Sequence, residues 1–343
     1  MKLSDRLRCA AGCAAVLAAT IAARPASADQ AHPVIGFTVY DMTSFIFLGK
    51  EGAQAIADAD GAKLVWASAQ SDPAKQAAQL RQFIDQKVDA IVVAPLASPA
   101  VDAAIQAAKA AGIPVIVTNL AAGDLVMKDI VAYVGPDDVK AGESEAIHVV
   151  DALGHKGGLV VLQGPLGGSG ELDRSRGIRN ILAKEPDVHV LGMASANWRR
   201  TEAYTLTQTF ITRFGDKLNA VICENDDMAI GAIQALREKN LVGKVVVAGT
   251  DGIKEGMRNV HAGTQIETNL QDAMLELGLA LQVAVDKVQA RPVPKLAMLV
   301  MPQLTKDNVQ HYYDQMFVNL EQFKTGLPGL VKKNLASGTY AEQ

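Results

Sequence analysis

Cysteine, clusters of metal-binding side chains and long apolar runs are all scarce in this sequence. Only three cysteines are present, and Cys9 and Cys13 lie in the first thirty residues. A chain trimmed there keeps Cys223 alone and forms no internal disulfide. The six histidines are scattered without the spacing of metal ligands, so we expect no metal site. Beyond the N-terminal stretch, no segment reaches the roughly 18 apolar residues of a membrane helix, so we expect no membrane insertion of the mature chain.

Motifs for catalysis are missing as well. No Gly-x-Ser-x-Gly element occurs, and no serine can be tied to a histidine and an acid by sequence. The glycine-rich segment from Gly164 to Gly170 lacks the lysine of a phosphate loop, which leaves a loop against a ligand or a tight turn. Cys223 stands beside Glu224, and an acidic neighbour disfavours the thiolate form. We therefore predict no enzyme activity and no cofactor.

The first 28 residues have the organisation of a secretory signal peptide. A basic start contains Lys2, Arg6 and Arg8, and an uncharged stretch of 15 residues follows at 9–23. Residues 26–28, Ala-Ser-Ala, form a small-residue cleavage site. The uncharged stretch is too short and too rich in alanine to span a bilayer. We expect cleavage after residue 28 and export of a soluble chain.

The exported part of the chain is moderately acidic. The 33 Lys and Arg minus four in the leader, and the 37 Asp and Glu minus one, leave a formal charge of about −7. We therefore expect no nucleic-acid partner. The length of the exported chain exceeds what one hydrophobic core usually organises, and this favours two domains.

Apolar runs of strand length alternate with alanine-rich amphipathic stretches along the whole chain. This alternation predicts parallel sheets covered by helices on both faces. The runs form two series of similar plan, which we interpret as two doubly wound α/β lobes. The expected strands are 34–39, 64–67, 90–94 and 114–118 in the first series, and 131–134, 159–162, 188–191, 220–223 and 245–248 in the second.

The two lobes are expected to share several connections. Candidate crossings are Tyr133 to Asp137, Ile266 to Asn269 and Leu299 to Pro302. A chain that crosses more than once forms a hinge, which couples closure of the lobes to whatever lies between them. The predicted organisation is a signal peptide at 1–28, an N-terminal lobe at 31–134 plus 270–300, a C-terminal lobe at 135–269, and a C-terminal helix and tail at 301–343.

The segment from Asn219 to Leu236 is the most informative single stretch. A short apolar run ends in Glu-Asn-Asp-Asp at 224–227, and apolar residues then resume at helical spacing. This pattern predicts a buried strand feeding a helix, with the polar residues at the carboxyl end of the strand, where open α/β sheets bind ligands. Helix capping accounts for Asp226 or Asp227. It accounts less well for Asn225, which is therefore a candidate ligand-binding residue.

Further polar and aromatic residues follow strand-like runs, or stand at the expected crossings, in both series. Carboxylates accept hydrogen bonds, the arginine fork donates them and amides do both, so such groups can pair with the hydroxyls of a sugar or polyol. Aromatic rings can cover its C–H faces. Each member taken alone is also explained as a core or surface residue. The set comprises Phe45, Asn119, Arg174, Trp198, Asn225, Asp251 and Asn269.

Several short motifs around these residues match a known family. Residues 224–232 read E-N-D-D-M-A-I-G-A, residues 249–252 read G-T-D-G, and Leu-Gln-Gly at 162–164 is followed by D-R-S-R-G at 173–177. Together they resemble the periplasmic sugar-binding proteins of the ribose-binding type, the soluble receptors of ABC importers, whose corresponding motifs include Q-N-D-E-M-A-L-G-A and G-F-D-G. The resemblance runs from about Pro33 to Met301. It implies a type I periplasmic-binding fold with a ligand cleft between the lobes.

Carried over by position, the resemblance implies a set of ligand-binding residues. The asparagine, carboxylate and arginine of the family fall on Asn225, Asp251 and Arg174, and its two aromatic positions fall on Trp198 and Phe45. Its polar hinge position falls on Asn269 and its first-loop asparagine on Thr43, while Asp41 is a candidate replacement acceptor. In the ribose-binding pattern that the chain resembles, Asp-Arg follows the fourth strand, whereas this chain has Asn119-Leu120 at that position. Hydroxyls left unpaired by that change cost about 1–3 kcal/mol each, which argues against ribose itself.

The resulting hypothesis is a monomeric periplasmic solute-binding protein. It would capture a small sugar, a polyol or a related hydroxylated compound in the cleft and deliver it to the membrane permease of an ABC importer. Two alternatives stay open. One is a ligand-sensing periplasmic protein that docks on a chemoreceptor or sensor kinase, and the other is a secreted hydrolase of a small sugar derivative, which lacks a recognisable nucleophile. A sugar-responsive repressor is disfavoured by the leader and by the missing helix-turn-helix segment.

Overall fold

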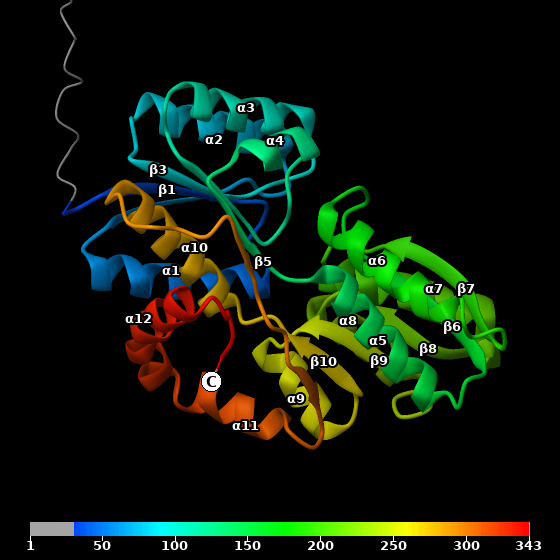
Figure 1. Ribbon diagram of the computed structural model, residues 1–343. Helices are drawn as coiled ribbons and strands as arrows, with labels where there is room; N and C mark the ends of the chain where they lie inside the picture. The colour runs from blue at the N-terminus through cyan, green and yellow to red at the C-terminus, as the bar shows by residue number, and fades with distance from the viewer. Residues whose placement is uncertain (1–30, 343) are drawn as a thin grey trace, which may run out of the picture.

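Two six-stranded sheets, one in each lobe, form the framework of the protein (Figure 1). The computed structural model describes residues 31–342, so the predicted leader at 1–28 lies outside the described residues. The first sheet has the strand order β11-β5-β4-β3-β1-β2, and its strands pair in parallel. These strands are β1 Val34–Val39, β2 Lys63–Ser68, β3 Ala90–Ala94, β4 Val115–Thr118, β5 Ala132–Gly135 and β11 Leu296–Met298.

The second sheet has the order β12-β10-β9-β8-β6-β7. Its strands pair in parallel except for β12, which runs antiparallel to β10. The prediction of two doubly wound α/β lobes is confirmed, although β5, expected to open the second series, belongs to the first sheet. The strands are β6 Gly157–Gln163, β7 Val188–Ser195, β8 Leu218–Cys223, β9 Val246–Asp251, β10 Glu267–Leu270 and β12 Gln303–Thr305.

Helices cover both faces of the first sheet, as its wholly buried central strands require. Helices α2, α3 and α4 lie on one face, and α1 and α10 pack together on the other (Figure 1). The first turns of α1 and α10 are fixed by the side chains of Thr43 and Asp272, which accept from backbone N–H groups. The bounds are α1 Ser44–Asp60, α2 Pro73–Asp85, α3 Pro99–Ala110, α4 Asp124–Asp129 and α10 Ala273–Val288.

The second sheet is covered in the same way. Helices α5 and α6 pack against each other, while α8 contacts both α7 and α9. The bounds are α5 Asp138–Ala152, α6 Ser169–Leu182, α7 Arg200–Phe214, α8 Asp226–Glu238 and α9 Lys254–Ala262, with a short 3-10 turn at Gly215–Lys217. None of the helices within residues 31–342 is long and apolar enough to cross a bilayer.

The chain passes between the lobes between β5 and α5, between β10 and α10, and between β11 and β12. The first and third passages fall within the expected segments. The second lies at Gln271 and Asp272, whereas Ile266 to Asn269 was expected to cross. Most of that expected segment is strand β10, because its residues are buried and pair with both β9 and β12.

Residues 301–342 follow a longer path than the single packed helix expected there. Strand β12 joins the second sheet, and α11 (Val309–Tyr313) lies beside α9. A π-helical turn at Asp314–Val318 then leads to α12 (Leu320–Ser337), which packs on α1 and α10 of the first lobe (Figure 1). The segment thus contacts both lobes. A three-residue strand is too short to give a periodic sequence signal, which is why β12 was not predicted.

Close packing of α1 on α10 generates the first testable prediction. A β-carbon at Gly52 would collide with the backbone of Met274, whereas one at Gly329 in α12 would meet no atom within 4 Å. We expect Gly52→Ala to lower the free energy of unfolding by about 1–3 kcal/mol through overpacking. Gly329→Ala should leave it unchanged or raise it by up to about 1 kcal/mol. Urea unfolding followed by circular dichroism measures both, and equal stabilities would contradict this account of the helix contact.

Candidate ligand-binding site

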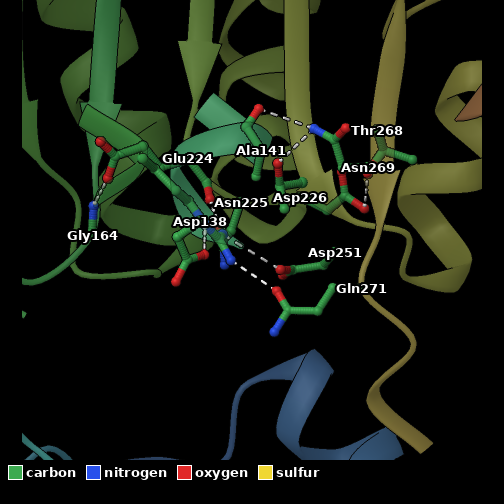
Figure 2. Close-up of polar contacts among 12 residues, drawn as sticks. Asp138, Ala141, Gly164, Glu224, Asn225, Asp226, Asp251, Thr268, Asn269 and Gln271 are labelled. Carbon is green, nitrogen blue, oxygen red and sulfur yellow. Dashed lines mark hydrogen bonds and ion pairs between the residues drawn. The ribbon is translucent and has the colours of Figure 1, made fainter. Parts of the chain in front are cut away.

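Arg174, in the second turn of α6, is the centre of a buried polar cluster between the lobes. Its Nε donates to Asp138 Oδ1 at 2.8 Å, and its Nη2 donates to Gln271 Oε1 at 2.8 Å. Its Nη1 donates to the carbonyl of Glu224 and lies 3.7 Å from Asp251 Oδ1. Figure 2 shows these groups converging from α5, from the ends of β8 and β9, and from the passage after β10. The structure therefore brings together Arg174 and Asp251, as the sequence predicted, and adds Asp138 and Gln271.

Trp198 forms one side of this cluster. The guanidinium of Arg174 lies 5.4 Å from the centre of the Trp198 ring, within the range of a cation–π contact. The backbone of Gly164 packs so closely on the indole that a β-carbon there would collide with it. The start of the glycine-rich loop after β6 therefore packs against the tryptophan. Trp198 and its neighbour Asn197 both have positive φ. Non-glycine residues adopt this conformation rarely, and it is frequent at functional sites.

The end of β8 differs from its sequence interpretation. Asn225, not Asp226 or Asp227, caps α8, because its Oδ1 accepts from Met228 N at 2.9 Å. Asp226 is fully buried and accepts from the Thr268 hydroxyl at 3.0 Å. The extended backbone of Asn225 places its side chain over the first turn of α8. The sequence pattern alone did not show which of Asn225, Asp226 and Asp227 is the capping residue. The cap uses only the oxygen of the Asn225 amide.

Glu224 connects the cluster to the glycine loop. Its carboxylate accepts from Gly164 N at 2.8 Å and from the Ser175 hydroxyl at 2.6 Å, while its carbonyl accepts from Arg174. Sequence reasoning gave Glu224 no role at the site. The available signal was an acid placed directly after an apolar strand, where burial of a carboxylate requires dedicated hydrogen bonds.

Asn119 is a residue of the first lobe that is linked to the arginine cluster. It follows β4 with a positive φ, and its Nδ2 donates to Glu276 Oε1 at 3.1 Å. The other oxygen of Glu276 accepts from Gln271 Nε2 at 2.8 Å. Because Gln271 also contacts Arg174, a continuous series of hydrogen bonds joins Asn119 to the cluster. Neither Glu276 nor Gln271 was predicted.

Three further predicted residues lie around the start of α1. Thr43 caps the helix through its hydroxyl, which accepts from Ile46 N at 3.2 Å. Phe45 is buried in the same continuous apolar cluster that contains Trp198. Asp41 is partly exposed, and its carboxylate accepts from the Ser71 hydroxyl at 2.6 Å and from Arg199 at 3.1 Å.

Direct contacts hold the two lobes together in this structure. The ion pair of Asp41 with Arg199 joins the loop after β1 to the start of α7. The Ser44 hydroxyl donates to Asp227 Oδ1 at 3.0 Å, and Ala121 N donates to the Ser169 hydroxyl at 2.7 Å. These contacts link α1 with α8 and the loop after β4 with α6, so the lobes are in a closed arrangement.

Asn269 lies apart from the arginine cluster. Its Nδ2 contacts the Ala141 carbonyl at 3.3 Å and the Thr250 hydroxyl at 3.2 Å (Figure 2). It also lines a cavity of about 410 Å³ beside the interlobe passages, together with residues 298–301 and Gln303. The structure therefore places Asn269 at the hinge and does not bring it to Arg174.

The site is rich in buried carboxyl groups. Burial raises the pKa of Glu145, Glu224 and Glu276 to about 8 and that of Asp226 to about 7. Burial also raises the pKa of Asp251 well above its usual range, against the opposing effect of Arg174. Such groups are hydrogen-bond acceptors when ionised, and they favour a partner that brings hydroxyl donors without a negative charge.

Chemically reactive groups are not evident at the site. Cys223 is buried at the end of β8, and burial raises the pKa of its thiol well above the usual range. Within residues 31–342, no group of three or more histidine, cysteine and acidic side chains has an arrangement that could hold a metal ion. The arrangement is suited to hydrogen bonding and ring contact with a small molecule.

Comparison with known proteins gives one matching family. A profile described as "Periplasmic binding protein domain" matches residues 35–292. The chain is 43% identical to the xylitol-binding protein of Mycolicibacterium smegmatis, over 90% of this chain and 87% of the relative. It is 30% identical to the ribose import binding protein RbsB of Bacillus subtilis, over 78% of this chain and 86% of that protein.

Solved structures of solute-binding proteins have the same fold. One is an ABC transporter solute-binding protein from Bacillus halodurans with bound myo-inositol, with a TM-score of 0.78 and 26% identity. The alignment covers 84% of this chain and 99% of that one. Another is a periplasmic solute-binding protein from Actinobacillus succinogenes with bound D-allose, with a TM-score of 0.76 and 28% identity, covering 82% and 100% of the two chains.

The buried carboxyls predict an unusual dependence of stability on pH. Their pKa values are higher in the folded protein than in the unfolded chain, so the unfolded chain loses these protons first as the pH rises. We expect the free energy of unfolding without ligand to decrease from about pH 5 to about pH 8, by on the order of 1 kcal/mol per pH unit for each of these carboxyls, and then to level off. Urea unfolding across this range measures the slope.

A variant isolates one contributor to that slope. Glu145 is fully buried, accepts from the Thr250 hydroxyl at 2.7 Å and titrates near pH 8. Glu145→Gln removes its proton equilibrium and should flatten the decrease. Stability that stays constant or rises between pH 5 and pH 8 in the wild type would show that these carboxyls are not protonated in the folded state.

Proposed function

The chain belongs to the family of periplasmic sugar-binding proteins of the ribose-binding type that serve ABC transporters, and from this we propose that it captures a small neutral polyol or sugar between its lobes. Members of this family bind solutes without catalysing a reaction, so the chain is a binding protein. The observation that carries the proposal is the buried cluster of Arg174 with Asp251 and Trp198 at the meeting of the two lobes. The similarity to a xylitol-binding protein supports pentitols as the first candidate ligands to test.

The chemistry of this cluster fits a compound with several adjacent hydroxyls. Each hydroxyl both donates and accepts, so it can pair with a carboxylate such as Asp251 and with a donor such as Arg174. The indole of Trp198 supplies an apolar surface for C–H groups. We assign Asn225 a ligand contact through its amide nitrogen, since its oxygen caps α8.

The first lobe contributes the opposite side of the proposed site. Asn119, after β4, and Phe45, in the first turn of α1, are assigned direct contacts with the ligand. Thr43 and Asp41 are assigned places at the rim of the site, where Asp41 holds Arg199 of the other lobe. We assign Asn269 a role at the hinge, because it lines the cavity beside the interlobe passages.

Closure is the proposed means of communication with the transporter. Contacts across the lobes, such as Ser44 with Asp227 and Asp41 with Arg199, form only when the lobes approach. A ligand that contacts both lobes favours this closed form, because binding energy shifts the equilibrium between the two arrangements. We propose that residues 1–28 direct export to the periplasm, and that a membrane permease takes the ligand from the closed form.

A thermal-shift panel tests the proposed ligand class. A compound bound only by the folded protein raises the melting temperature in proportion to the logarithm of its concentration. We expect xylitol and related pentitols to raise it most, and ribose, myo-inositol and D-allose to act more weakly. The sodium salts of the corresponding sugar acids serve as charged controls and should have no effect. If no polyol or sugar shifts the melting temperature at millimolar concentration, the proposed function is wrong.

Asp251 provides a test of the site itself. We expect Asp251→Ala to weaken binding of xylitol roughly 10- to 100-fold in isothermal calorimetry, since a ligand hydroxyl then loses a buried partner at about 1–3 kcal/mol. Circular dichroism should show an unchanged fold. The control is Asp129→Asn, which removes a carboxylate from an exposed ion pair with Lys109 and should bind like the wild type. Wild-type affinity in Asp251→Ala would remove Asp251 from the site.

A further inference from the structure

Glu276 in α10 occupies an unusual position for an acid. It is fully buried, and each of its two carboxyl oxygens accepts from the amide nitrogen of a different side chain. Oε1 accepts from Asn119 at 3.1 Å, and Oε2 accepts from Gln271 at 2.8 Å. Asn119 directly follows β4 in the first lobe, and Gln271 belongs to the passage between β10 and α10. One carboxyl group therefore fixes two amides that approach from different segments.

The orientation of the two amides follows from this contact. An amide presents donors on its nitrogen and an acceptor on its oxygen, and the Glu276 carboxylate, when ionised, can only accept. Gln271 turns its nitrogen toward Glu276, so its oxygen is available to Arg174 Nη2, which donates to it at 2.8 Å. Asn119 also turns its amide nitrogen toward Glu276, so its amide oxygen points away from Glu276 and is available as an acceptor.

Retention of an acid here carries a cost in stability. The positive charge that acts on Glu276 is that of Arg174, which already contacts Asp138, while the charge of Glu276 contributes to the raised pKa values of the Tyr40 and Tyr133 phenols. Burial outweighs the attraction of Arg174 and raises the pKa of Glu276 to about 8. An apolar side chain at position 276 would avoid the free-energy cost of burying a carboxyl group. The presence of an acid there therefore indicates a role other than packing.

We propose that Glu276 is a positioning residue for ligand selection, which holds Asn119 and Gln271 so that the first-lobe side of the site presents hydrogen-bond acceptors. The inference rests on the proposed function and adds a determinant to it. The acid comes from α10 and acts through the amide of Asn119. A ligand with a free hydroxyl donor opposite Asn119 is selected.

Substitution by glutamine separates positioning from packing. Glu276→Gln keeps the size of the side chain but has only one acceptor oxygen, so it can hold only one of the two amides in its present orientation. At about pH 9, where Glu276 is ionised, we expect the affinity of this variant for xylitol in isothermal calorimetry to be about tenfold or more below that of the wild type, with an equal or higher melting temperature without ligand. The matched control is Asp286→Asn, the same chemical change on the same helix, where the acid pairs with Arg291. It should bind xylitol like the wild type.

A double-mutant cycle tests whether Glu276 acts through Asn119. We expect Asn119→Ala to weaken xylitol binding on its own, and Glu276→Gln to cost less than roughly twofold when added to it. The ratio of wild-type to Glu276→Gln affinity should also grow from about pH 6.5 to about pH 9, because ionised Glu276 accepts from both amides at once. A merely structural role would give no such pH-dependent ratio.

The possible outcomes distinguish the two proposals. If the wild type binds xylitol and Glu276→Gln binds it equally well, or if the two substitutions are additive, the role of Glu276 is refuted while the proposed function stands. If xylitol does not bind, the titrations use the panel compound that raises the melting temperature most. If no compound of the panel binds the wild type, the proposed function fails and this inference fails with it.

Discussion

The buried guanidinium of Arg174 is the constraint on which the site depends. A charge removed from water must be paired and hydrogen-bonded, and Arg174 meets this need with groups from several elements. Close contact of α5 with α6 makes the arrangement possible. A β-carbon at Gly142 would collide with the backbone of Arg174, and one at Gly177 would collide with Val139. These two glycines let Asp138, at the start of α5, reach the arginine.

Movement of the lobes is limited by more than the three passages of the hinge. The segment after β12 is fixed to the second lobe by the contact of Tyr313 with Arg258, at 2.9 Å, and to the first by the ion pair of Lys324 with Glu51, at 2.8 Å. The backbone of Tyr340 also pairs with the third passage at Leu299. The π-helical turn at Asp314–Val318 lies between the two attachments. Opening of the lobes therefore either bends this turn or breaks one of these contacts.

Sequence patterns predicted the lobes because strictly alternating apolar runs and helices leave few other folds. They also predicted that Arg174 and Asp251 belong together, since both follow strands of one sheet. Glu276 escaped prediction because it lies within a mostly apolar helix and contacts Asn119, which is 157 positions away in the sequence. The cap at Asn225 depends on the extended backbone conformation of that residue. The sequence does not reveal this conformation, and the adjacent Asp226 and Asp227 are equally good capping residues by type. Local sequence patterns predict helices, strands and the ends of strands, whereas tertiary packing determines the hydrogen-bond partners of buried polar groups.

The balance of charge between the lobes bears on which ligands can bind. Asp138 and Asp251 contact one arginine whose donors are already engaged, and Glu276 is linked to that arginine through Gln271. A ligand carboxylate would find no free cation among these residues, so its charge would be buried without a partner. A neutral polyol instead brings donors to the acceptors that Asp251 and the Asn119 amide present. Because each unmatched buried polar group costs about 1–3 kcal/mol, the same acids that lower the stability of the empty protein favour closure around a hydroxyl-rich ligand.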